Sequence, residues 1–154
     1  MKRLYLLRHA KSSWDNPELK DFDRPLNKRG YKEAKEMAEY IKEKDYYPDV
    51  ILCSTARRTR GTLEPILLAL NYDKDPVFLD SIYESSWLRL KEEVEKRDEE
   101  SVMLIGHCPG IELYLSALLR EYKSMKTSHL AVVDMEQVKL IDFIRPKEFS
   151  DRVE

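Results

Sequence analysis

The hydrophobic positions of this 154-residue chain follow two alternating patterns. Short apolar runs rich in β-branched residues and leucine lie at 4–7, 50–53, 77–79 and 102–105. Continuous runs of this kind are typical of strands buried on both faces of a sheet. The segments between them carry apolar residues at helical spacing, so the alternation predicts an α/β fold.

The helical segments differ in how they present their apolar residues. Tyr31, Ala34, Ala38 and Ile41 share one face of a predicted helix, and Asn27 precedes that helix as a candidate N-cap. A second helix is expected to begin near residue 56, with Pro65 shortening or kinking it. A third should contain residues 87–94. A fourth, over about 110–119, is apolar almost all round, so we expect it to be buried.

The chain ends with two further apolar stretches, at 130–133 and 138–144, separated by a polar tetrapeptide. This spacing predicts a hairpin or a pair of edge strands. The whole pattern favours a three-layer α/β/α sandwich with a mainly parallel central sheet, formed by residues 1–154 as a single domain.

Charge and composition exclude several classes of partner. The chain has 27 Lys and Arg against 29 Asp and Glu, a formal net charge of −2, which gives no bulk attraction to nucleic acid or anionic membranes. No apolar run approaches the roughly 20 residues that span a bilayer. We therefore expect a cytoplasmic protein, with Cys53 and Cys108 reduced.

Polar residues of one chemical type follow three of the four predicted strands. Arg8-His9 follows the first, the segment from Ser54 to Arg58 follows the second, and His107 follows the fourth. The carboxyl ends of parallel strands meet at one edge of a sheet, where open α/β folds bind their ligands. Two imidazoles and at least one additional guanidinium there could offset the charge of a phosphate group. The sequence thus predicts a phosphate pocket without a metal.

Each of these residues also has a simpler explanation. Arg57 and Arg58 could cap a solvated helix, and His107 could be a hydrogen-bonded core histidine. A histidine after a strand can act as base, acid, nucleophile or metal ligand. The coincidence at three strand ends favours a functional site over separate structural roles.

Four motifs in order carry a family resemblance. They are Leu-Arg-His-Ala-Lys-Ser-Ser-Trp, Asp-Arg-Pro-Leu-Asn-Lys-Arg-Gly, Ser-Thr-Ala-Arg-Arg-Thr-Arg-Gly-Thr and Gly-His-Cys-Pro-Gly. Over residues 4–119 the chain resembles the SixA-like phosphohistidine phosphatases of the histidine phosphatase, or phosphoglycerate-mutase-like, superfamily. The resemblance implies that His9 is the phosphorylated nucleophile. It also implies that Arg8 and Arg58 bind the phosphoryl oxygens and that His107 is the second pocket histidine.

Two departures from the family pattern bear on the substrate. Sugar-phosphate members usually have glycine after the histidine and an asparagine donor seven residues beyond the arginine, where this chain has Ala10 and Asp15. An ionised aspartate accepts hydrogen bonds but cannot donate them. Ser12 or Asn16 could supply the donor instead, and Ser12 is the predicted substrate-binding residue.

The general acid is open between two carboxylates. The resemblance implies a glutamate near residues 80–84, where Glu84 and Asp80 are both candidates. Both could equally be surface carboxylates that favour the start of a helix. Phosphohistidine can leave as a protonated imidazole and needs such an acid less than an alkyl ester does, so the ambiguity favours N–P bonds.

Other catalytic classes fit the residues less well. A cysteine phosphatase needs arginine at a fixed distance after its cysteine, and counting from Cys53 reaches Thr59 at that position. A zinc site lacks ligands at suitable spacing, and His129 reads as a structural or surface histidine. We therefore expect a cofactor-free phosphatase acting on a phosphohistidine-bearing protein. A small-molecule phosphomonoesterase and a non-catalytic phosphoprotein-binding module are the alternatives.

Overall fold

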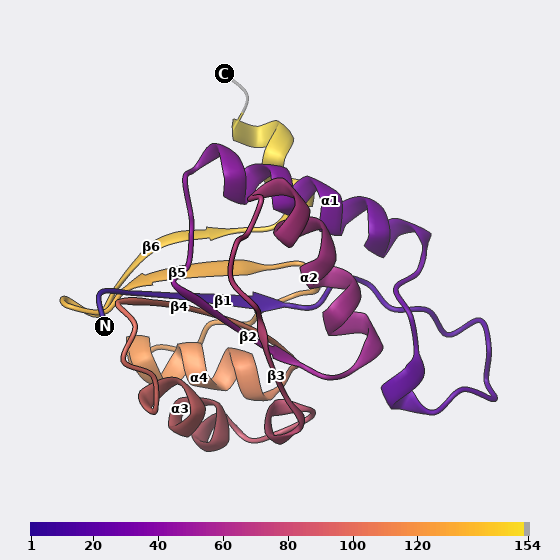
Figure 1. The fold of residues 1–154 in the computed structure, drawn as a ribbon, viewed down its shortest axis with the longest axis horizontal. Helices are drawn as coiled ribbons and strands as arrows, with labels where there is room; N and C mark the ends of the chain where they lie inside the picture. Colours follow the sequence, from indigo (N-terminus) through magenta and orange to yellow (C-terminus); the bar gives the residue numbers. More distant parts are fainter. Residues whose placement is uncertain (153–154) are drawn as a thin grey trace.

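The computed structural model describes residues 1–152 and contains one six-stranded sheet in the order β3-β2-β4-β1-β5-β6 (Figure 1). The strands and their bounds are β1 Arg3–Arg8, β2 Val50–Ser54, β3 Val77–Leu79, β4 Ser101–Gly106, β5 Leu130–Asp134 and β6 Lys139–Ile144. The first four are parallel, whereas β5 and β6 join antiparallel at one edge. This confirms the predicted sandwich with a mainly parallel sheet and a terminal hairpin.

Helices cover both faces of this sheet (Figure 1). Their bounds are α1 Lys28–Glu43, α2 Arg57–Ala69, α3 Trp87–Glu95 and α4 Gly110–Leu119, with short 3₁₀ helices η1 Asp21–Asp23, η2 Asp80–Ile82 and η3 Pro146–Arg152. One apolar cluster lies between the sheet and α1 with α2, and a second lies between the sheet and α3 with α4. Burial on both faces explains why the central strands are continuously apolar.

Local signals set the start of α1. The Asn27 side chain accepts a hydrogen bond from the Gly30 amide at 2.8 Å, which confirms the predicted N-cap. Gly30 is required for packing, because a Cβ there would lie 2.0 Å from the Lys11 carbonyl oxygen. Tyr31 was expected on the core face but is largely exposed, and Met37 is buried there instead.

Two helices differ from the sequence expectation. α2 continues through Pro65 to Ala69, because Leu63 and Ile66 on either side of the proline are buried and hold the helix against the core. α4 was expected to be buried all round, but Leu113 is 40% exposed. The helix is covered by the sheet and α3 on one side only, so its outer apolar residues remain accessible.

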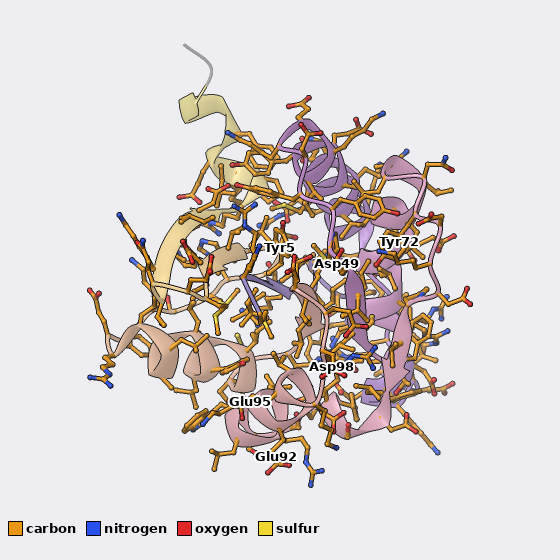
Figure 2. The ribbon with its side chains drawn as sticks, turned by 60° about the vertical axis from the view of Figure 1, so that its left-hand side comes forward. Tyr5, Asp49, Tyr72, Glu92, Glu95 and Asp98 are labelled. Atoms are coloured by element: carbon orange, nitrogen blue, oxygen red, sulfur yellow. The ribbon has the colours of Figure 1, made fainter. Side chains whose placement is uncertain are left out.

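The two ends of the parallel strands differ in chemistry. Figure 2 is viewed from the side where the parallel strands begin, and its labelled carboxylates Asp49, Glu95 and Asp98 lie there. Arg8, His9 and His107 lie on the opposite side, where these strands end. The loop between β1 and α1 extends beyond the carboxyl ends of the strands (Figure 1).

No helix within residues 1–152 is long and apolar enough to cross a membrane.

Candidate functional site

The structure brings Arg8, His9, Arg58 and His107 to the carboxyl ends of the parallel strands. Arg8 ends β1 opposite Gly106, the last residue of β4, so His9 and His107 leave neighbouring strands at the same level. Their ring centroids lie 5.4 Å apart. Arg58 lies in the first turn of α2, directly after β2, and only 2% of its side chain is exposed. We call these four residues the quartet.

His9 is held as a neutral base with a defined tautomer. Its Nδ1 lies 2.7 Å from the Ala10 carbonyl oxygen, which can only accept, so Nδ1 carries the proton and Nε2 keeps its lone pair. Burial lowers the pKa of His9 to about 3, against the hydrogen bond to Ala10, which raises it; the charges of His107, Arg58 and Arg8 add to the lowering. The imidazole is therefore neutral at neutral pH, with its proton on Nδ1.

The two quartet arginines keep buried donors free of protein partners. Arg8 donates from Nη1 to the Met125 carbonyl at 2.9 Å. Arg58 donates from its terminal nitrogens to Asp21 and Glu84. The Nε groups of Arg8 and Arg58 are both buried and find no hydrogen-bond partner among the described residues. Buried donors left unpaired are costly, so these two Nε groups are candidate donors for a bound anion.

His107 is oriented by β2. Its Nε2 lies 2.8 Å from the Ser54 hydroxyl, and the edge of the Tyr83 ring packs near its imidazole at a centroid distance of 5.4 Å. Burial lowers the pKa of His107 to about 3, and the charge of Arg58 adds to this. Its Nδ1 is buried without a hydrogen bond within the described chain and lies 3.7 Å from Glu84 Oε1. Like His9, it is a buried, neutral imidazole.

The structure separates the two acid candidates. Glu84 Oε1 accepts from Arg58 Nη2 at 2.6 Å and lies beside His107. Asp80 instead accepts from the Thr55 hydroxyl at 2.6 Å and makes no contact with the quartet among the interactions of the described residues. Glu84 also has a φ of 50°, a left-handed conformation that non-glycine residues adopt rarely and that is enriched at functional sites. Of the two, only Glu84 contacts members of the quartet among the interactions of the described residues.

Ser12 lies near the quartet but is engaged elsewhere. It is buried, and its hydroxyl oxygen accepts from Arg24 Nη1 at 2.9 Å. Asp15 and Asn16 are exposed in the outer part of the same loop. Arg24 also stacks over the Trp14 ring at 3.6 Å, so this loop is held together by one buried guanidinium.

The sequence did not predict one residue that lies beside the quartet, Asp21. Its carboxylate contacts Arg58, and the Tyr83 hydroxyl donates to it at 2.5 Å. Asp21 lies two residues before the Asp-Arg-Pro-Leu motif, and no spacing rule connects it to Arg58, which is 37 residues away in sequence.

Other candidate groups have separate positions. The Cys53 thiol is buried, and burial raises its pKa to about 12, so it is not a nucleophile in this environment. His129 is a buried structural histidine whose ring stacks on Phe143 at 3.9 Å. Within residues 1–152, no three His, Cys, Asp or Glu side chains are grouped so that they could hold a metal ion.

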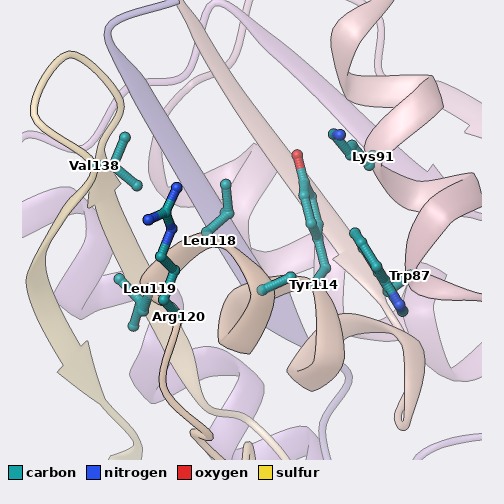
Figure 3. A pocket seen from close by; sticks show the side chains of 8 residues that line it. Trp87, Lys91, Tyr114, Leu118, Leu119, Arg120 and Val138 are labelled. Carbon is teal, nitrogen blue, oxygen red and sulfur yellow. The ribbon is translucent and has the colours of Figure 1, made fainter.

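A separate cavity of about 520 Å³ lies beside α3 and α4 (Figure 3). Trp87 and Lys91 of α3, Tyr114 and Leu118 of α4, and Arg120 at the end of α4 line it. It contains no member of the quartet. This cavity is therefore distinct from the phosphate pocket predicted from the sequence.

Comparisons with known proteins identify the family. A model of the histidine phosphatase superfamily (branch 1) matches residues 4–109. The chain belongs to this superfamily. It is similar to a crystal structure from Agrobacterium tumefaciens assigned to the phosphohistidine phosphatase SixA, with 39% identity, a TM-score of 0.87, and coverage of 94% of this chain and 98% of that one.

More distant matches agree on the fold. A structure of the protein histidine phosphatase SixA complexed with tungstate has 21% identity and a TM-score of 0.83, covering 96% of this chain and 99% of that one. A chloroplastic protein of Arabidopsis thaliana without an assigned function is 33% identical over 143 residues, 86% of this chain. The chain spans 66% of the length of that Arabidopsis relative.

Proposed function

We propose that the chain is a metal-independent phosphatase that hydrolyses phosphohistidine on a protein through a covalent intermediate on His9. The observation that carries this proposal is the neutral His9 imidazole, with its Nε2 lone pair free, beside the unpaired buried Nε donors of Arg8 and Arg58. A nucleophile adjacent to donors for phosphoryl oxygens is the arrangement that phosphoryl transfer to an enzyme requires.

The first step is an in-line displacement at phosphorus. His9 Nε2 forms the new N–P bond while the bond from phosphorus to the leaving group breaks. The imidazole gains positive charge, which the Ala10 carbonyl stabilises through its 2.7 Å contact with Nδ1–H. Arg8 and Arg58 donate to the phosphoryl oxygens throughout, so the pocket stabilises the charge of the transition state without a metal.

The second step returns the enzyme to its starting state. The oxygen of a water molecule attacks the phosphorus bound to His9 Nε2, and the N–P bond breaks. The water protons stay on the phosphate, which leaves, and the neutral imidazole is restored. His107 lies beside His9 with its Nδ1 unpaired, so it is suited to hydrogen-bond a phosphoryl oxygen or the incoming water. Two displacements thus replace one direct hydrolysis.

Phosphohistidine is favoured as the substrate because Glu84 is already paired with Arg58. Its carboxylate pairs with Arg58 at 2.6 Å, and an ionised carboxylate accepts a proton but cannot supply one. A phosphohistidine can leave as an imidazole that carries its own proton, whereas an alkyl alcohol needs an acid. The similarity to the Agrobacterium protein assigned as a phosphohistidine phosphatase supports the same substrate class.

A protein substrate is favoured by the open surroundings of the pocket. The side chains of Asp21 and Glu84 border Arg58 and are each nearly half exposed, at 46% and 44%. Trp14 on the adjoining loop is 72% exposed. These exposed side chains surround the buried quartet and would be the first contacts of a phosphorylated side chain on a folded protein.

The test compares three substrates at matched concentrations: a phosphohistidine-bearing protein, phosphoserine and p-nitrophenyl phosphate. We expect phosphate release from the phosphohistidine protein, and its loss in His9→Ala. Release from the aryl ester alone would refute the phosphohistidine assignment. Substantial release by His9→Ala would refute the nucleophile, and binding without release would indicate a phosphoprotein-binding module.

A further inference from the structure

Asp21 is the most heavily hydrogen-bonded carboxylate beside the quartet, although it comes from a loop element of three residues. Its Oδ2 accepts from Arg58 Nη2 at 3.0 Å and from the Tyr83 hydroxyl at 2.5 Å. Its Oδ1 accepts from Arg24 Nε at 3.2 Å and Nη2 at 3.0 Å. Its backbone carbonyl accepts from Arg58 Nη1 at 2.8 Å.

These contacts fix the orientation of Arg58. Both terminal nitrogens of the guanidinium are bound by one residue, through its backbone and its side chain, which leaves the buried Nε free of partners. A guanidinium is planar, so holding its two terminal nitrogens also sets the direction of Nε–H. Without Asp21, the long Arg58 side chain would retain Glu84 alone as an anionic partner.

Asp21 is itself held rigidly and kept charged. Arg24, which binds its Oδ1, is buried and also donates to the Ser12 hydroxyl and the Ser13 carbonyl. Burial would raise the pKa of Asp21, but the hydrogen bond from Tyr83, the charge of Arg58 and the hydrogen bonds from Arg24 and Arg58 outweigh it and lower this pKa to about 2. The carboxylate is therefore anionic at any pH at which the protein would work.

We propose that Asp21 is a positioning residue that orients Arg58 for the phosphoryl group, with Arg24 and Tyr83 fixing Asp21 in turn. This inference rests on the proposed phosphatase function. The geometry assigns Asp21 no contact with the reacting atoms: it acts through Arg58. Displacement of a phosphate-binding group by about 1 Å can cost 10²-fold in rate.

A competing role predicts the opposite sign. If Asp21 only neutralised Arg58, removing its charge would strengthen the attraction between the pocket and phosphate. Asp21→Asn would then bind inorganic phosphate more tightly and lower KM. If Asp21 orients Arg58, the same substitution weakens phosphate binding and lowers kcat, because the guanidinium loses its fixed direction.

The experiment measures two quantities for the wild type and Asp21→Asn. The first is the Kd of inorganic phosphate by calorimetry, and the second is the pair kcat and KM for the phosphohistidine protein and p-nitrophenyl phosphate. Asp23→Asn is the matched control, because Asp23 lies in the same 3₁₀ helix, carries the same charge, is exposed, and makes no side-chain contact among the described residues. Melting temperature reports folding in every variant.

We expect Asp21→Asn to weaken phosphate binding and lower kcat by about 10- to 100-fold while Asp23→Asn stays within about twofold. Tyr83→Phe should produce a smaller loss in the same direction. Unchanged or tighter phosphate binding in folded Asp21→Asn would overturn the inference. Failure of the wild type to release phosphate would instead refute the proposed function, and phosphate binding would still test Asp21.

Discussion

The neutral state of His9 makes the protein sensitive to mild acid, and the size of the effect follows from burial. In the unfolded chain, His9 has its ordinary pKa of 6.5 and binds a proton as the pH falls below that value. In the folded protein, burial keeps the imidazole neutral down to about pH 3. Between these values the unfolded state binds more protons, so acidification favours unfolding.

The loss for His9 alone between pH 7 and pH 5 is about 2 kcal/mol of unfolding free energy. This figure depends on the unfolded pKa, because folded His9 is neutral at both pH values. His107 and His129 also have lowered pKa values, so they add losses of the same sign. A comparison with His9→Gln cancels their contributions and isolates the single imidazole.

The assay is urea unfolding of the wild type and His9→Gln at pH 7 and pH 5. Chloride buffers without phosphate or sulfate are needed, since a bound oxyanion would stabilise the charged imidazole. We expect the wild type to lose about 2 kcal/mol more than His9→Gln over this interval. Equal losses in the two proteins would show that folded His9 takes up a proton above pH 5, and the reasoning from burial would be wrong.

Two further substitutions test the packing and the acid candidate. Gly30→Ala should destabilise the protein by about 1–3 kcal/mol in urea unfolding, because its Cβ meets the Lys11 carbonyl, whereas Gly61→Ala meets only the flexible Leu26 side chain at 3.2 Å and should cost less. A gain in stability from the better helix propensity of alanine at Gly30 would contradict this contact. Glu84→Gln should change kcat/KM for the phosphohistidine protein by less than about tenfold, because that leaving group can carry its own proton. A loss of about 10²-fold or more on this substrate would show that Glu84 protonates the leaving group and would contradict its role as an anionic partner of Arg58.

The fold was predictable because its signals are local. Each apolar run corresponds to a strand. The central strands β1, β2 and β4 are buried on both faces and so carry continuous apolar runs, whereas β3 at the sheet edge is only partly buried, with Phe78 exposed. The cap at Asn27 is equally local, because its side chain bonds an amide three residues away. Pro65 shows where such signals fail: proline chemistry predicted that α2 would be shortened or kinked, but the helix continues to Ala69, because Leu63 and Ile66 beside the proline are buried.

The candidate site likewise contains residues that the sequence predicted and residues whose place depended on the folded chain. The sequence by itself determined that Arg8, His9 and His107 would meet an arginine from the segment after β2, because parallel strands end on the same side of a sheet. Within that segment, the family resemblance selected Arg58. Only the tertiary structure decided between the two acid candidates, since the path of the segment around η2 turns Glu84 toward Arg58 and leaves Asp80 with Thr55.

Asp21 depended entirely on the tertiary structure. It reaches Arg58 through a loop whose course is set by Arg24, Ser12 and the packing of Gly30 on Lys11, none of which follows a repeating spacing. Strand ends converge because backbone hydrogen bonding imposes a regular sheet. The loop carboxylates converge because individual side chains bind one another, and such contacts exist only once the chain has folded.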